Sequence, residues 1–172
     1  APYSNLGTMS NKGFDLTLGY DMRSTENFNW DTSLVISQYK NNLDEIANGI
    51  VLTQEVNTNG YQPVVVTNTT VGNPIGLFYG YKTDGLFKDQ ATLNSAPIQF
   101  GQTVGTGAGQ TALGDVKYVD VNKDGKIDAS DKTFIGNPHP KFTFGFTNNF
   151  KYKNIDCSVF LQGSYGNDVM NL

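Results

Sequence analysis

Alternation of apolar and polar residues is the feature that most limits what this chain can fold into. Every second residue is apolar from 13 to 20, and the pattern returns within 28–39, 142–150 and 155–165. A period of two places alternate side chains on opposite faces of a strand, and it does not fit a helix. Short polar turns separate the first stretch from the second and the third from the fourth. We therefore predict an all-β fold with antiparallel hairpins at 13–39 and 142–165.

The apolar side chains of both hairpins are predicted to form one continuous band. Its members are Phe14, Leu16, Leu18, Phe142, Phe144, Phe146, Val159 and Leu161. The opposite faces carry Thr, Ser, Asn, Asp and Gly, with Phe160 as an exception. A soluble sandwich and a membrane barrel both explain such alternation. The strands approach the roughly nine to eleven residues that a tilted membrane strand needs, which favours the barrel.

The connection between the hairpins, residues 40–141, has no sustained period, and we expect it to consist mainly of long loops. Residues 63–66 could form a short strand, 75–87 are aromatic and Gly-rich, and 88–114 have the composition of a loop. Short turns at one end of the hairpins and long loops at the other are typical of outer-membrane barrels.

An acidic loop, DVNKDGKIDASD, occupies residues 120–131 and leads directly into a Pro-rich turn and a strand. Its oxygen-bearing residues follow the spacing of an EF-hand-type calcium loop, with Gly125 at the sharp turn. The predicted ligands are Asp120, Asn122, Asp124, the backbone carbonyl of Lys126, Asp128 and Asp131. The predicted cofactor is a structural Ca²⁺. A polar turn that needs no metal is the alternative, because Asp and Asn side chains also accept hydrogen bonds from their own backbone.

Composition and motifs exclude several classes of function. The formal net charge is −4 and the 12 Lys and Arg are scattered, so no nucleic-acid partner is expected. No run of about 18 apolar residues predicts a transmembrane helix. No nucleophile elbow, phosphate loop or marked pair of carboxylates is present, so we expect no enzyme activity. His139 lies between two prolines and reads as a surface turn residue, and Cys157 as a small apolar filler.

Three segments carry a resemblance to a known family. They are NLGTMSNKGFDLTLGY, then VGNPIGLFYGYKTDGLF, then the C-terminal stretch from GDVKYVDVNKDGKIDASD through IGNPHPKFTFGF to SVFLQGSYGND. In this order they resemble the SusC/RagA-type TonB-linked outer-membrane transporters, over nearly the whole chain. The resemblance implies that residues 1–172 are a slice of the later half of a β-barrel, without the TonB box or plug domain. The start at Ala1 is expected to reflect processing or an internal position.

For the parent protein, the resemblance implies import of glycan fragments or peptides across the outer membrane. The implied partners are TonB, a SusD-like lipoprotein, the oligosaccharide or peptide substrate, and outer-membrane lipid. Two alternatives remain open from the residues alone. The first is a soluble calcium-binding β-module, with carbohydrate as a candidate ligand. The second is a fragment of a secreted glycan-degrading enzyme.

Overall fold

The computed structural model describes residues 6–25, 27–48, 50–57 and 63–171, and these form two compact units. The first unit comprises residues 1–52, 69–76 and 136–172, and the second comprises 53–68 and 77–135. Strands dominate both, so the predicted all-β class is confirmed. In the described part of the chain, no helix is long and apolar enough to cross a membrane.

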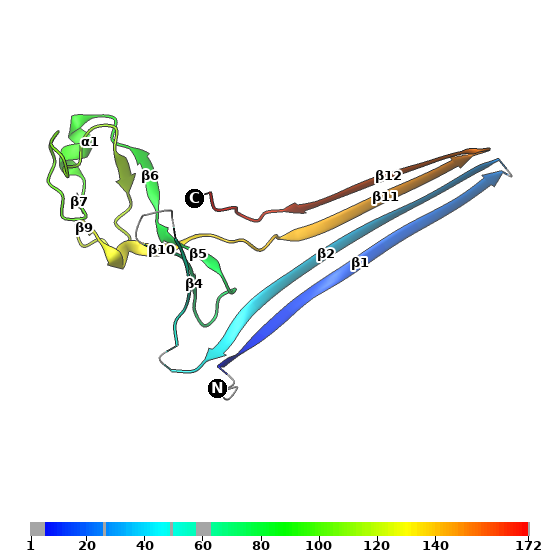
Figure 1. Ribbon diagram of the computed structural model, residues 1–172, viewed down its shortest axis with the longest axis horizontal. Coiled ribbons are helices and arrows are strands. Elements are labelled where there is room, and N and C mark those ends of the chain that lie inside the picture. Colours follow the sequence, from blue (N-terminus) through cyan, green and yellow to red (C-terminus); the bar gives the residue numbers. More distant parts are fainter. Residues whose placement is uncertain (1–5, 26, 49, 58–62, 172) are drawn as a thin grey trace. The chain divides into compact units, whose positions relative to one another are not determined.

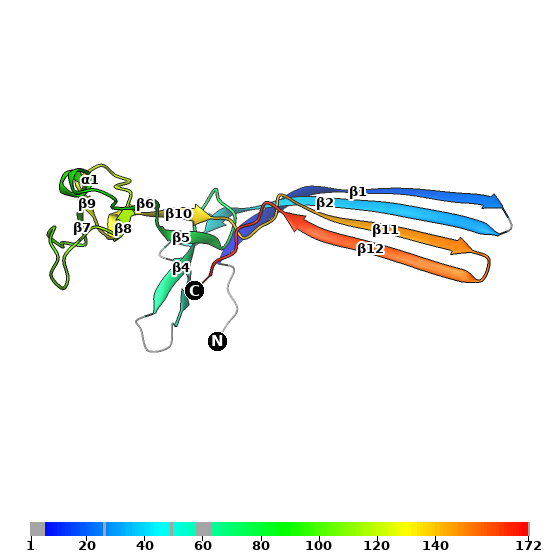
Figure 2. The same ribbon diagram turned by 90° about the horizontal axis from the view of Figure 1, so that it is seen from above.

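The first unit is built on a four-stranded antiparallel sheet in the order β1-β2-β11-β12 (Figure 1). Its strands are β1 (Gly7–Thr25), β2 (Phe28–Ile46), β11 (Phe142–Tyr152) and β12 (Ile155–Tyr165). Both predicted hairpins are present, and β1 and β2 extend beyond the predicted 13–39 at both ends. The two hairpins also pair with each other through β2 and β11, as the second view makes clear (Figure 2).

A short segment of the first unit, residues 69–76, pairs with the edge of β2 near one end of the strand. The amide of Leu43 donates to the carbonyl of Asn73 at 3.0 Å, and the amide of Gly72 donates to the carbonyl of Leu43 at 2.8 Å. Leu43 is 5% exposed, and it is the one buried apolar side chain of this unit among the described residues. The rest of the sheet is therefore not covered by the described residues of this unit.

Within its described residues, the second unit contains eight short strands and two short helices. A sheet in the order β10-β5-β4-β3 combines β3 (Leu52–Val56), β4 (Val64–Thr69), β5 (Leu77–Tyr81) and β10 (Lys132–Gly136). Two further pairs are β6 (Thr83–Leu86) with β8 (Val116–Tyr118), and β7 (Ile98–Gln99) with β9 (Lys126–Ile127). The helices are α1 (Gln90–Ser95) and the 3₁₀ turn η1 (Ala129–Asp131). The region expected to be mainly loop is therefore a folded body of short elements.

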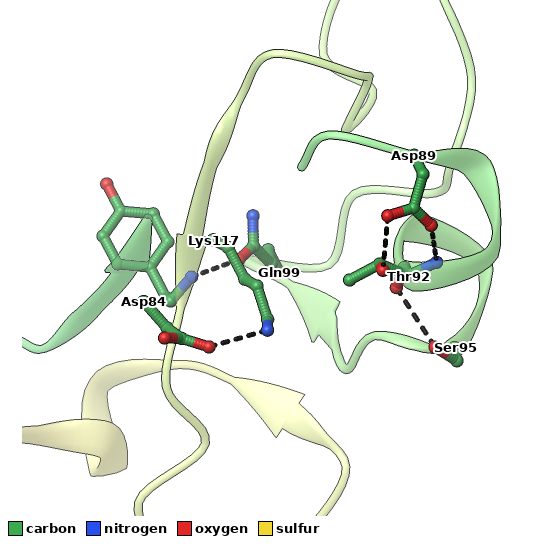
Figure 3. A network of polar contacts seen from close by, with 7 residues as sticks. Asp84, Asp89, Thr92, Ser95, Gln99 and Lys117 are labelled. Carbon is green, nitrogen blue, oxygen red and sulfur yellow. Dashed lines mark hydrogen bonds and ion pairs between the residues drawn. The ribbon is translucent and has the colours of Figure 1, made fainter. Parts of the chain in front are cut away.

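Side-chain hydrogen bonds hold the second unit together where its strands are too short to do so. The buried Gln99 side chain accepts from the amide of Tyr118 at 2.8 Å and donates to the carbonyl of Val116 at 3.0 Å, which joins β7 to β8. Asp89 caps α1 by accepting from the amide and hydroxyl of Thr92 (Figure 3). Phe87, Leu93 and Ile127, each at most 2% exposed, form its core.

Candidate functional site

The acidic loop, residues 120–131, uses its carboxylates to hold its own backbone. Asp120 accepts hydrogen bonds from the amides of Lys123 at 2.6 Å, Asp124 at 3.2 Å and Gly125 at 2.8 Å. Gly125 has a φ of 84°, in the left-handed region that favours glycine, as the predicted sharp turn requires. These are the bonds of a turn built on an Asp side chain.

Asp131, the last predicted ligand, is fully buried and closes the loop from its other end. Its Oδ1 accepts from the amide of Val121 at 2.8 Å, and its Oδ2 accepts from the amide of Asp128 at 2.9 Å. Asp128 in turn caps the 3₁₀ turn by accepting from the amide and hydroxyl of Ser130. The hydrogen bonds from Ser130 hold the pKa of Asp128 below its usual range.

The remaining predicted ligands, Asn122, Asp124 and Lys126, also lie in this loop. Asn122 donates to Ser130 and to Asp124, and Asp124 accepts from the amide of Lys126. The carbonyl of Gly125 accepts from the amide of Ile98 on β7, and the carbonyl of Ile127 accepts from the amide of Phe100, which follows that strand. The alternating carbonyl of Lys126 therefore points the other way. Within the described residues, no three His, Cys, Asp or Glu side chains are grouped so that they could hold a metal ion. The loop therefore folds as a hydrogen-bonded polar turn, and calcium binding stays a prediction.

The sheet of the first unit has two faces of opposite character. Cross-strand partners share a face, so the printed register defines rows across all four strands. One face carries the rows Leu16–Ile36–Phe144–Gly163, Leu18–Leu34–Phe146–Leu161, Tyr20–Thr32–Asn148–Val159 and Met22–Trp30–Phe150–Cys157. The predicted apolar band therefore lies on a single face, which we call the apolar face. Its side chains are open to the surroundings: Leu18 and Leu161 are each 55% exposed.

The polar groups within the apolar face have partners inside the sheet. The indole N–H of Trp30 donates to the side-chain oxygen of Asn148 at 3.3 Å, and the hydroxyl of Thr32 donates to the carbonyl of Thr147 at 3.0 Å. Trp30 also stacks on Phe150, with ring centroids 6.2 Å apart. These contacts satisfy the indole N–H of Trp30 and the hydroxyl of Thr32 without hydrogen bonds to water.

The opposite, polar face carries the rows Asp15–Ser37–Thr143–Ser164, Thr17–Val35–Gly145–Gln162, Gly19–Ser33–Thr147–Phe160 and Asp21–Asp31–Asn149–Ser158. Asn149 donates to Asp31 at 2.7 Å, and Lys151 lies 3.6 Å from Asp156. Val35 and Phe160 are its exposed apolar members. This composition suits contact with water.

His139 has a structural role that its isolated position in the sequence did not indicate. Its Nε2 lies 2.8 Å from the carbonyl oxygen of Ile75 and therefore donates to it. Nδ1 is then left to accept from the side-chain amide of Asn41 at 3.4 Å. Asn41 in turn accepts from the amide of Ile75 at 2.8 Å, and His139 meets Tyr39 edge to face. His139 thus fastens the 69–76 segment onto β2 rather than standing free on the surface.

Comparisons with known proteins relate the chain to one group of receptors, although no family model matches it. A TonB-dependent receptor of Formosa agariphila is 34% identical over 98% of the chain, and a second from the same organism is 28% identical over 97%. The TonB-dependent receptor SusC of Bacteroides thetaiotaomicron is 26% identical over 96% of the chain. The chain spans 15–16% of the length of these relatives.

Solved structures agree with the sequence comparison at the level of fold. The RagAB peptide importer in its open-open state matches 94% of the chain and 15% of the solved chain, with a TM-score of 0.60 and 17% identity. The closed-closed state of the same importer matches with a TM-score of 0.58 and 18% identity. The relatives are receptors and importers by name, not enzymes. In sequence and in fold, the chain is therefore similar to a segment of the SusC/RagA-type TonB-dependent receptors.

Proposed function

We propose that the sheet of the first unit is part of the wall of an outer-membrane β-barrel in a TonB-dependent transporter. The observation that carries the proposal is the division of one sheet into an apolar face and a polar face, neither of which is covered by the described residues of the first unit. Soluble proteins rarely leave a contiguous apolar surface of more than a few hundred Å² open to water. Lipid on one side and an aqueous lumen on the other satisfy both faces at once.

The aromatic side chains of the apolar face support a membrane position. At one end lie Phe14, Phe142 and Tyr165, and at the other lie Trp30, Phe150 and Tyr152. Phe142 and Tyr152 are the ends of the 11-residue strand β11, so about 33 Å of extended chain separates them. A tilt of about 40° reduces this to a height of about 25 Å, the height of the apolar band in outer-membrane barrels, which aromatic girdles flank.

Connectivity supports an orientation in the membrane. β1 leads to β2, and β11 to β12, through two-residue turns, whereas β2 and β11 are joined by residues 47–141. Outer-membrane barrels have short periplasmic turns and long extracellular loops. We therefore place the two short turns in the periplasm and the long connection, which includes the second unit, on the extracellular side.

The proposed cargo is a glycan fragment or a peptide, taken up with a SusD-like lipoprotein and driven through TonB. Support comes from the names of the proteins that the chain is similar to, namely the receptor SusC and the RagAB peptide importer. The polar face, rich in hydroxyl and amide groups, is suited to line the path of such polar molecules.

Within the second unit, we propose that the acidic loop binds Ca²⁺ as a structural cofactor. Each carboxylate can accept more hydrogen bonds or metal contacts than the backbone amides use, so Asp120, Asp124, Asp128 and Asp131 keep acceptor capacity for a cation, and the side-chain oxygen of Asn122 adds a further ligand. The carbonyl of Lys126 completes the predicted set. The ion would hold the loop and would take no part in transport chemistry.

Transport is tested in a strain that lacks the gene for the full-length protein. Growth on defined glycans and on peptides as sole carbon source should fail for one substrate class and return with the intact gene. The same growth should fail when TonB is absent. Purification of the tagged protein from outer membranes should also recover a SusD-like lipoprotein. Recovery of the full-length protein as a soluble monomer would contradict the proposal.

A further inference from the structure

We propose that Lys12, Lys40 and Lys141 form a binding site for the phosphate group of a membrane lipid at the extracellular edge of the apolar face. This inference rests on the proposed membrane position of the sheet. It adds a specific lipid contact that neither the fold nor the relatives assign.

The first observation is a pair of like charges on one row of the sheet. Lys12 on β1 is the direct cross-strand partner of Lys40 on β2, and both side chains are exposed. Like charges that face each other across two strands are destabilising. No carboxylate among the described residues forms an ion pair with either ammonium group. Lys12 interacts electrostatically with Asp44, whose carboxylate also accepts from Ser10 and Asn42, so two ammonium groups face one carboxylate and the pair keeps a net positive charge.

The second observation is the position of this pair relative to the apolar face. Lys12 precedes Phe14 by two residues and Lys40 follows Gln38 by two, so both lysines share the face of the band. Their row is the next one beyond the end marked by Phe14, Phe142 and Tyr165. Lipid head groups lie at this level of a membrane, just outside the aromatic girdle.

A small hollow beside Lys40 provides room for a ligand. It opens where the pairing of β2 with β11 ends, measures about 160 Å³, and is lined by Lys40 and Lys141, while Lys12 lies outside it as the cross-strand partner of Lys40. This volume is well below that of a site for a drug-sized molecule and suits a phosphate group with its waters. The stem of Lys141 packs closely against Gly166, where an added Cβ would lie 2.8 Å from its Cγ and Cδ.

The nearby acidic groups are already engaged. Asp44 accepts from the hydroxyl of Ser10 at 3.0 Å and from the side-chain amide of Asn42 at 2.7 Å. Asp168 accepts from the amide of Asn137, which also lines the hollow, at 2.7 Å. The charges of these two carboxylates reduce, without cancelling, the positive potential of the three ammonium groups, so an anion is the ligand that complements the site. A lipid phosphate is the anion that the adjoining apolar face would present there.

The test uses the full-length receptor in lipid nanodiscs of phosphatidylcholine, to which phosphatidic acid is added as the phosphate-bearing probe. Native mass spectrometry counts the bound phosphatidic acid molecules at each concentration. The double variant Lys12→Gln/Lys40→Gln is expected to weaken this binding about 30-fold, since each lysine near a membrane surface contributes about a fivefold factor. Lys141→Gln should weaken it by about fivefold. The matched control Lys82→Gln/Lys88→Gln removes two exposed lysines of the second unit and should leave binding unchanged.

Two results would overturn the lipid site. Equal phosphatidic acid binding by the double variant and the control would show that the lysines do not hold the lipid. Equal thermal stabilisation by inorganic phosphate and by phosphatidic acid would identify a general anion site instead. Failure of the unmodified receptor to insert into any nanodisc is a separate outcome, which contradicts the proposed membrane position itself.

Discussion

The two units of this chain obtain their stability from different sources. Of the buried apolar side chains in the described residues, five lie in the second unit, and Leu43 alone lies in the first. The second unit also has buried polar groups that are satisfied internally, such as Gln99 and Asp131. The first unit has longer strands and more complete pairing, yet both faces of its sheet are open. Regular strands alone do not make a body that is stable in water, because burial of apolar surface supplies the main driving force.

The largest effect is expected at the core of the second unit. Phe87→Ala should cost about 3–5 kcal/mol, because it removes a ring that is 1% exposed and leaves a cavity. The neighbouring Leu86 is 51% exposed, so Leu86→Ala should change stability by about 0.5 kcal/mol or less. Hydrogen exchange of the β6 and β8 amides in the full-length protein measures both. Equal protection in the two variants would mean that the second unit has no core of its own.

A charge placed on one face of the sheet or on the other tests the first unit, because it shows whether the two faces have different surroundings. Leu161→Arg puts a charge at the middle of the apolar face and should cost about 2–4 kcal/mol in a bilayer. Gln162→Arg puts the same charge on the polar face, one residue away, and should be nearly neutral. Guanidinium unfolding of the full-length receptor in phospholipid bilayers gives both values. Similar losses for the two variants would argue against lipid on one face and water on the other.

Calcium should stabilise the second unit only. Added Ca²⁺ is expected to raise its melting temperature by an amount that grows with the free ion concentration, because filling the loop relieves repulsion among its carboxylates. The double variant Asp120→Asn/Asp124→Asn should abolish this rise. Differential scanning calorimetry with calcium and with a chelator provides the comparison. The same melting temperature in both conditions for the unmodified protein would mean that the loop is a turn without a metal.

The smallest effect is an acid sensitivity of the second unit. Hydrogen bonds lower the pKa of Asp89 and Asp128 below the ordinary 3.8, mainly those from the backbone amides of Thr92 and Ser130. For a lowered pKa, the stabilisation is present above the ordinary value and is lost as pH falls through the folded value. Protection of the Thr92 amide should therefore hold down to about pH 4 and fall below it.

Asp89→Asn provides the control for this acid sensitivity. An Asn at this position still caps α1, because Asn and Asp are equally good N-caps. It cannot titrate, so the acid-dependent loss of protection at Thr92 should disappear in the variant. A loss of the same size in the variant and the unmodified protein would assign it to other groups.

The parts of the fold that the sequence predicted are the local ones. The two hairpins could be read from alternation because a strand exposes alternate residues to different surroundings. The pairing of β2 with β11 could not, since it joins Trp30 to Phe150 across a long connection with no periodic signal. The second unit was also missed, because two- and three-residue strands carry no period and a buried Gln99 looks like any polar residue.

The candidate sites also differ in whether the sequence could predict them, and again local contacts were predictable and long-range contacts were not. The acidic loop was found from spacing alone, because its hydrogen bonds join residues close in sequence. The role of His139 depends on Asn41 and Ile75, which lie far away in the chain, so no local pattern indicated it. The Lys12–Lys40 pair became visible only when the register of β1 against β2 was known.

The most direct test of lipid on the apolar face uses the single cysteine of the chain. Cys157 lies on that face, in the row of Trp30 and Phe150, and the next residue, Ser158, lies on the polar face. In the full-length receptor, with cysteines outside this chain replaced by serine, a charged water-soluble maleimide should not label Cys157 in intact outer membranes. It should label the variant that combines Cys157→Ser with Ser158→Cys. Rapid labelling of Cys157 in the membrane, at the rate of the Ser158→Cys variant, would contradict the account.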